Sequence, residues 1–337
     1  SGGGKRVTRG GSSLIGLIIA AVVLLGGGGG LLGNMLGGSD VTSSADYGIS
    51  QSAYENILGS GGSASSGSSG GAGSVNSSTG SSGSNNTASV NTSVASGSRA
   101  KRTAILGNGD DEVTIMVYMC GTDLESKYSM GTKDLMEMTR ASLSDKVHVV
   151  AYTGGCKKWN NQVISSSVNQ IYEVVSGGLK CVNDNAGTGA MTSPSTLSSF
   201  IQFCTENYPA NRYELILWDH GGGSVSGYGY DEKNTKSGSM SLSGINQALS
   251  AAGVSFDFIG FDACLMATVE NGLMLEKYAD YMIASEETEP GIGWYYTSWL
   301  TKLSQNTSMD TAQIGKNIVD DFVSTCGSEC RGQSATL

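Results

Sequence analysis

The sequence contains only two histidines, His148 and His220, so any reaction that needs an imidazole has two candidates. Seven cysteines in 337 residues are too few for a disulfide scaffold, and an odd number leaves at least one thiol without a partner in the chain. Cys326 and Cys330 form the only close pair. Because no histidine or second cysteine pair accompanies them, zinc is not expected there and no metal ligand is assigned; a local disulfide or two free thiols is expected instead.

Phosphate-binding and serine-nucleophile motifs are also missing. Glycines 221–223 match neither G-x-G-x-x-G nor G-x-x-x-x-G-K-[ST], and residues 222–226 do not form G-x-S-x-G. Basic residues are outnumbered as well: the formal net charge is −10, and from residue 103 onward fourteen Lys and Arg face twenty-seven Asp and Glu. Such a surface repels nucleic acid and mildly attracts cationic ligands, so no nucleic-acid partner is expected.

An apolar stretch near the N-terminus predicts a membrane anchor at residues 13–33, behind a basic segment at 1–12. The stretch reaches the ~20 residues that a bilayer span needs. Basic residues in front and none behind place the N-terminus inside the cell and the remainder outside. A cleaved signal peptide is the alternative, which would give a secreted protein, but no small-x-small site directly follows the apolar run.

Residues 34–102 are predicted to form a Gly/Ser-rich linker, because this composition buries too little apolar surface to fold. Arg99-Ala-Lys-Arg102 ends the linker with exposed basic residues and is a candidate proteolytic site. Residues 103–337 are long enough for one domain with a sizeable core. Their last residues resemble the start of another strand, so we expect the domain to be truncated there.

Within this domain, short apolar runs alternate with helical patterns, and such β–helix–β units predict an α/β fold with a mostly parallel central sheet between two helical layers. A hairpin or edge strands are expected at 163–168 and 170–175. The other expected strands are 114–119, 146–152, 215–218, 256–261 and 281–285, and the expected helices are 133–142, 195–207, 242–252, 268–278 and 312–324.

Two of these strands end in residues that can do chemistry. Strand 215–218 leads into His220, and strand 256–261 leads into Cys264. If the strands are neighbours, the imidazole and the thiol meet at the carboxyl edge of the sheet, where the ring can relay the proton of an attacking thiol. A helix directly after Cys264 is expected to lower the thiol pKa, and Gly221 leaves its N–H open to an oxyanion.

Cys264 and His148 each also have a plainer interpretation, as structural residues. A free cysteine is most often a buried small hydrophobic residue, so for Cys264 both interpretations stay open from position alone. His148 is surrounded by valines inside a strand and is expected to be structural.

Four stretches then carry a resemblance to a known family: TIMVYMCGTDLE at 114–125, LILWDHGGG at 215–223, GFDACLMA at 260–267 and SEETEPGIGW at 285–294. From about residue 113 to its end, the chain resembles the clostripain family of cysteine peptidases, which has the caspase-like α-β-α sandwich fold. The resemblance implies that Cys264 is the nucleophile and His220 the base or proton donor. It also implies that the N–H groups of Gly221 and Cys264 bind the oxyanion.

The resemblance further implies protein or peptide substrates cleaved after Arg or Lys, with a carboxylate in the specificity pocket. Asp262 is the best candidate by motif, and the acidic loop with Glu287 and Glu289 is expected to line the same pocket. Relatives are often zymogens activated by self-cleavage between the His and Cys motifs, which here points to Lys233 or Lys236. No cofactor is required. Clostripain responds to calcium, so calcium stays open, although no D-x-[DN]-x-[DN]-G loop is present.

The alternative from another functional class is a non-catalytic extracellular binding module that keeps the caspase-like fold and uses its cleft or acidic loop for binding. The presence of both His220 and Cys264 argues against it. Fluorogenic peptides that differ in the residue at the cleaved bond separate the two interpretations.

Overall fold

The computed structural model describes residues 89–329. The predicted segments 1–12 and 13–33, and the linker up to residue 88, lie outside the described residues. Within 89–329, no helix combines the length and hydropathy that a membrane crossing requires.

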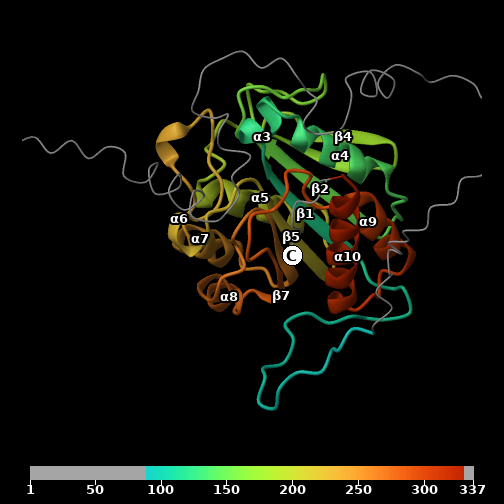
Figure 1. Ribbon diagram of the computed structural model, residues 1–337. Coiled ribbons are helices and arrows are strands. Elements are labelled where there is room, and N and C mark those ends of the chain that lie inside the picture. Colours follow the sequence, from blue (N-terminus) through green and yellow to red (C-terminus); the bar gives the residue numbers. More distant parts are fainter. Residues whose placement is uncertain (1–88, 330–337) are drawn as a thin grey trace, which may run out of the picture.

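A seven-stranded sheet forms the centre of the domain, with the strand order β4-β3-β2-β1-β5-β6-β7 (Figure 1). Five strands are parallel, and β3 and β4 form an antiparallel hairpin at one edge. The mostly parallel sheet is therefore confirmed. The strands are β1 (Val113–Cys120), β2 (Val147–Gly154), β3 (Gln170–Val175), β4 (Gly178–Asn183), β5 (Arg212–Trp218), β6 (Phe256–Asp262) and β7 (Ala279–Ile283).

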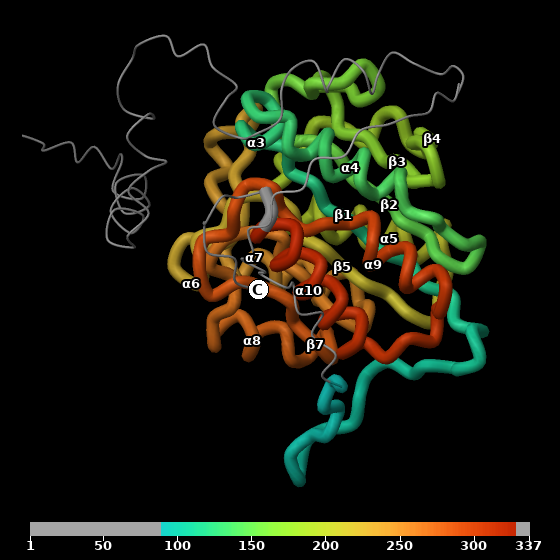
Figure 2. Tube along the Cα trace, turned by 45° about the vertical axis from the view of Figure 1, so that its right-hand side comes forward, coloured from blue at the N-terminus to red at the C-terminus, as the bar shows by residue number. Residues whose placement is uncertain are grey.

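Helices cover both faces of this sheet (Figures 1 and 2). Alternate residues of β1 divide between two cores: Val117 packs with α4, α9 and α10, whereas Tyr118 packs with α5 and α7. Because both faces are covered, the central strands are continuous apolar runs. The helices are α3 (Thr122–Ser126), α4 (Met130–Arg140), α5 (Pro194–Asn207), α6 (Gly223–Ser226), η2 (Thr235–Ser237), α7 (Leu242–Ala252), α8 (Val269–Leu275), α9 (Tyr296–Gln305) and α10 (Thr311–Glu329).

Two local predictions were wrong. Residues 163–168 form no strand; β3 pairs instead with β4 across a tight turn in which Gly177 has φ +88°, a conformation that glycine adopts without strain. Helix α9 was not predicted: the acidic loop was expected to extend to residue 296, and the residues after it received no assignment. Its buried residues Tyr296, Trp299, Leu300 and Leu303 nevertheless have the spacing of one helix face.

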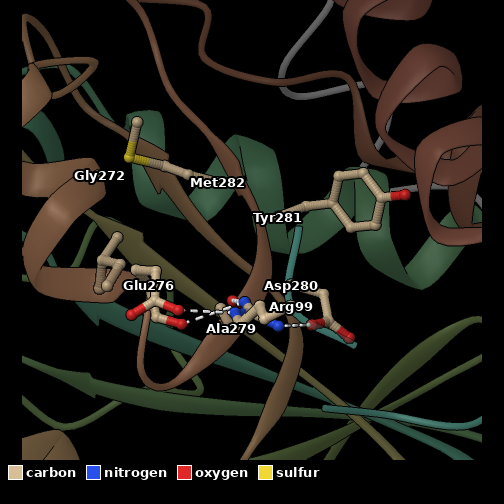
Figure 3. A pocket seen from close by; sticks show the side chains of 8 residues that line it. Arg99, Gly272, Glu276, Ala279, Asp280, Tyr281 and Met282 are labelled. Carbon is tan, nitrogen blue, oxygen red and sulfur yellow. Dashed lines mark hydrogen bonds and ion pairs between the residues drawn. The ribbon is translucent and has the colours of Figure 1, made fainter. Parts of the chain in front are cut away.

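The basic cluster that ends the linker is exposed, as expected, but it is also bound to the domain, as the contacts of Arg99 show (Figure 3). Asp280 accepts hydrogen bonds from Arg99 Nη1 at 2.8 Å, from the backbone N–H of Arg102 at 2.8 Å and from Thr103 Oγ1 at 3.0 Å. Arg99 Nε also contacts Glu276 at 2.7 Å. Burial acts to raise the pKa of Asp280, but the bonds from Arg99, Arg102 and Thr103 outweigh it and lower that pKa.

We predict that Asp280→Ala frees this segment for proteolysis. Hydrogen bonds to a charged group contribute roughly 1.5–3 kcal/mol each, so losing them raises the frequency of local opening about tenfold or more. Limited trypsin digestion followed by mass spectrometry is expected to show correspondingly faster cleavage after Arg99, Lys101 or Arg102. Asp310→Asn, which removes only the exposed partner of Lys101, is the matched control. Equal cleavage rates in all three proteins contradict the prediction.

A buried ionic cluster lies toward the amino ends of β5 and β6. Arg212 is fully buried, pairs with Asp257 and donates to the carbonyl oxygens of Thr307 and Met309. Glu214 is also fully buried, and neither of its carboxyl oxygens has a hydrogen-bond partner among the described residues. Burial raises the pKa of Glu214 from 4.5 to about 8, although Arg212 acts in the opposite direction.

We predict that Glu214→Gln removes part of the pH dependence of stability. The carboxyl group is more easily protonated in the folded state, so its contribution to stability is fully present below pH 4.5 and is lost as pH rises through about 8. Each pKa unit corresponds to about 1.4 kcal/mol, so the loss is on the order of a few kcal/mol. Urea unfolding is expected to show the variant more stable above pH 8, with the difference closing toward pH 5. Glu286→Gln, which changes an exposed carboxyl group, serves as control. Equal pH dependence of the free energy of unfolding in Glu214→Gln and the parent protein contradicts the prediction.

Candidate active site

Strands β5 and β6 are neighbours, as expected, and their register aligns the two candidate catalytic residues. Trp218 lies beside Asp262 in the parallel pair, so His220 and Cys264 each follow two residues later at the same carboxyl edge. The chain segments touch here: a Cβ atom on Gly221 would lie 2.1 Å from the carbonyl oxygen of Cys264. Only glycine therefore allows this approach.

The loop after His220 leaves the Gly221 N–H out of its hydrogen bonds. Gly221 and Tyr228 form an isolated antiparallel bridge. The two bonds around it run from Gly229 N to the His220 carbonyl and from Gly222 N to the Gly227 carbonyl. The bridge consequently does not use the donor that was predicted to bind an oxyanion.

The imidazole of His220 is held by two residues that sequence reasoning did not single out. Its Nε2 lies 2.9 Å from Asp123 Oδ1, and its ring stacks on Tyr230 with centroids 5.5 Å apart. Burial acts to lower the pKa of His220, but Asp123 and Asp219 outweigh it and raise that pKa. Asp123 follows β1, the strand next to β5, so the strand-end rule that selected His220 also applies to it.

The thiol of Cys264 has a different environment from the predicted one. Helix α8 begins only at Val269, capped by Thr268, and Leu265 adopts a left-handed conformation with φ +66°. The expected helix directly behind the thiol is therefore absent, and its dipole does not lower the thiol pKa. Burial instead raises the pKa of Cys264.

A segment of the acidic loop covers this thiol. The backbone N–H of Glu289 donates to Cys264 Sγ at 3.2 Å, while the Leu265 and Ala267 N–H groups donate to the carbonyl oxygens of Glu287 and Ser285 at 2.9 Å. Within residues 89–329, no hydrogen bond joins Cys264 to His220. The two side chains share an edge of the sheet without a direct hydrogen bond in this conformation.

Three carboxyl groups cluster at this loop, Asp262 and Asp134 beneath it and Glu289 on it. Asp262 accepts hydrogen bonds from Tyr296 Oη at 2.7 Å and from the Trp294 N–H at 3.2 Å, and burial raises its pKa to about 7. Burial also raises the pKa of Asp134 and of Glu289; one oxygen of Glu289 has no hydrogen-bond partner in the described part of the chain. None of the ion pairs found between residues 89 and 329 involves these three groups.

The other predicted residues lie apart from this cluster. The side chain of Glu287 is exposed, unlike that of Glu289. Lys233 is partly buried and donates from Nζ to the Ser166 carbonyl at 2.7 Å, whereas Lys236 is exposed on η2. His148 lies in the amino half of β2, away from the catalytic edge, as expected for a structural residue. Among the described side chains, no three His, Cys, Asp or Glu residues are grouped to hold a metal ion, and calcium stays an untested expectation.

Comparison with known proteins adds a family to this geometry. The model of the Clostripain family matches residues 117–337. This chain belongs to the clostripain family. The family predicted from the four sequence motifs is therefore confirmed.

Clostripain from Hathewaya histolytica is 31% identical over 123 residues, which are 32% of this chain and 23% of clostripain. An inactive zymogen C11 protease from Parabacteroides distasonis has a similar structure, with a TM-score of 0.51, 24% identity, and coverage of 65% of this chain and 60% of that one. A secreted C11 cysteine protease from Bacteroides thetaiotaomicron, bound to an irreversible peptide inhibitor, has a TM-score of 0.49 and 23% identity. That alignment covers 65% of this chain and 59% of the other. The alignments thus span under a quarter of clostripain and about three fifths of the two solved chains. The likeness to the zymogen supports the fold of this clostripain-family domain.

Proposed function

We propose that this protein is a cysteine endopeptidase that cleaves protein or peptide substrates after Arg or Lys, with Cys264 as nucleophile and His220 as the proton carrier. Membership of the clostripain family supports the class of reaction. The observation that carries the residue assignment is the β5–β6 register, which brings the imidazole and the thiol to one edge of the sheet.

In the proposed reaction, Sγ of Cys264 attacks the carbonyl carbon of the cleaved bond and gives its proton to His220. The tetrahedral oxyanion is stabilised by the N–H groups of Gly221 and Cys264. His220 then donates the proton to the leaving amine as the C–N bond breaks, and water hydrolyses the thioester. The Gly221 donor suits this role because the neighbouring backbone bridge leaves it unused.

The carboxyl cluster supports a preference for a cationic side chain at the cleaved bond. Asp262 and Asp134 are buried and Glu289 is partly buried beside them, without an ion pair to a described basic residue, and this burial disfavours ionisation. An entering guanidinium or ammonium group supplies the missing positive charge and forms charge-assisted hydrogen bonds. A neutral or acidic side chain has no such compensation.

The described conformation corresponds to a closed form of this site. Asp262 is only 5% exposed beneath Trp294 and Tyr296, and the backbone N–H of Glu289 is hydrogen-bonded to the sulfur of Cys264. Substrate entry therefore requires the segment 285–294 to move. Such a covered site suits a zymogen, the state in which the Parabacteroides distasonis relative was solved.

The predicted anchor at 13–33 remains a proposal for how the domain is held at the membrane. Residues 99–103 join the domain beside the start of β7, at the amino edge of the sheet, whereas Cys264 lies at the carboxyl edge (Figure 1).

We predict that Cys264→Ala lowers turnover by roughly 10⁴-fold or more and abolishes any self-processing, because the nucleophile is lost. The measurement uses fluorogenic peptides with Arg, Lys, Asp or Asn at the cleaved bond, and only the Arg and Lys peptides are expected to react. Cys181→Ser, which changes another exposed thiol, is the control. If the parent protein, extended by its natural C-terminal continuation, cleaves no peptide, the non-catalytic binding module becomes the better interpretation.

We predict that self-cleavage occurs after Lys236 rather than Lys233. Lys236 is exposed, whereas Lys233 is fixed by Ser166 and by Asp231, which accepts the N–H groups of Lys233 and Asn234. Lys236→Gln is expected to leave one intact chain, while Lys233→Gln and Lys236→Arg are still cut. Intact-mass measurement and N-terminal sequencing of the fragments decide between the two bonds. A new N-terminus at Asn234 overturns the assignment, and an uncut chain with full activity removes self-cleavage altogether.

A further inference from the structure

Three adjacent parallel strands, β1, β5 and β6, end at one edge of the sheet and place Asp123, His220 and Cys264 along it. Asp123 lies on α3, directly after β1. Its Oδ1 is 2.9 Å from Nε2 of His220, and its side chain is only 8% exposed. A buried carboxylate beside an imidazole is a strong orienting partner, because both the hydrogen bond and the charge favour one ring orientation.

Tyr230 contacts both members of this pair. Its hydroxyl donates to the same Oδ1 atom at 2.6 Å, and its ring is stacked on that of His220 with planes 16° apart. The second oxygen of Asp123 lies 3.3 Å from Nζ of Lys127. The carboxylate is thus fixed from two sides, and the plane of the imidazole is fixed by the Tyr230 ring.

We propose that Asp123 is the positioning residue of the catalytic dyad and that Tyr230 holds the Asp123–His220 pair in place. This inference rests on the proposed peptidase function. With Nε2–H donated to Asp123, Nδ1 of His220 is the nitrogen that accepts the thiol proton. The same nitrogen later donates that proton to the leaving amine.

In the proposed reaction, Nδ1 of His220 takes the proton of Cys264 as the S–C bond forms. This step makes His220 an imidazolium next to the Asp123 carboxylate. Nδ1 then gives the proton to the amine nitrogen as the C–N bond breaks, and the ring is neutral again. Asp123 stays ionised throughout: it stabilises the imidazolium and selects the tautomer, as the aspartate of a Ser-His-Asp triad does.

A purely structural role for Asp123 would keep α3 in place without changing the pKa of His220. The test therefore measures the pKa of the imidazole itself. The titratable and charged groups that face His220 are Asp123 and Lys127 from α3, Tyr230 from the following loop and Asp219 from the end of β5. Asp219, Lys127 and Tyr230 stay the same when only Asp123 is changed. The difference between parent and variant therefore reports Asp123 alone.

The first measurement does not depend on peptidase activity. In a His148→Gln, Cys264→Ala background, His220 is the only histidine of the chain, so its pKa can be followed by NMR of a single imidazole. Asp123→Asn is expected to lower that pKa by about one unit or more, because a carboxylate within hydrogen-bond distance shifts a neighbouring pKa by about 1–3 units. Asp110→Asn, an exposed single-charge change on the other edge, is expected to leave it unchanged.

The second measurement uses the intact nucleophile and the Arg peptide. Asp123→Asn is expected to lower kcat by about 10²–10⁴-fold with little change in KM, and to displace the acidic limb of the pH profile toward lower pH. Tyr230→Phe, which removes one hydroxyl and retains the stacked ring, is expected to lower kcat by a smaller factor and to raise the His220 pKa slightly, because the hydroxyl no longer withdraws charge from the Asp123 oxygen that faces the imidazole. This milder variant keeps the test valid if Asp123→Asn fails to fold.

An unchanged His220 pKa in both Asp123→Asn and Tyr230→Phe overturns the proposal, as does full activity of Asp123→Asn. If Asp123→Asn lowers the His220 pKa but the parent protein cleaves no peptide, the Asp123–His220 pairing is supported and the peptidase function is rejected instead. The two failures are thereby distinguishable.

Discussion

The candidate site depends on the close parallel approach of β5 and β6 at their carboxyl ends. Gly221 passes so near the Cys264 carbonyl oxygen that a single methyl group would separate the two segments. This contact, together with the register of Trp218 and Asp262, brings the backbone of His220 and that of Cys264 to the same edge before any side chain is oriented. Orientation comes from a third strand: β1 delivers Asp123, and Asp123 sets the imidazole. Three adjacent strands thus define the geometry that the chemistry requires.

Buried charge is the second organising feature of this edge. Asp262 and Asp134 lie under the loop 285–294 and Glu289 lies on it; burial raises the pKa of each, and repulsion by Asp262 adds to this for Asp134 and Glu289. The closed form accommodates them by favouring protonation over ionisation. Binding of a cation reverses this balance, because a positive charge restores the ionised form. In the proposed peptidase, recognition of Arg or Lys would therefore be coupled to opening of the loop and to proton release from these carboxyl groups.

Much of the fold followed from local sequence patterns, because buried parallel strands and amphipathic helices have strong periodic signals. Helix 242–252 was predicted with its observed bounds, and the strand at 256–261 ends one residue early. The failures occurred where non-local contacts decide. The segment after Cys264 pairs with residues 285–289 and so does not become helical at once. Neither the proximity of Asp123 to His220 nor the burial of Asp262 under Trp294 is encoded by spacing, since each depends on which strands are neighbours.

The loop between the two motifs has one part that supports the site and another that is open to cleavage. Tyr230 is tied to Asp123 and Asp219, and Asp231, next to it, accepts the N–H groups of Met191, Lys233 and Asn234. A cut after Lys236 falls beyond these bonds, so Tyr230 stays stacked on His220 while the remaining loop gains freedom. A cut after Lys233 would instead detach Asn234 from Asp231 and loosen the support of the imidazole. The exposed bond is therefore also the one whose cleavage is compatible with an ordered His220.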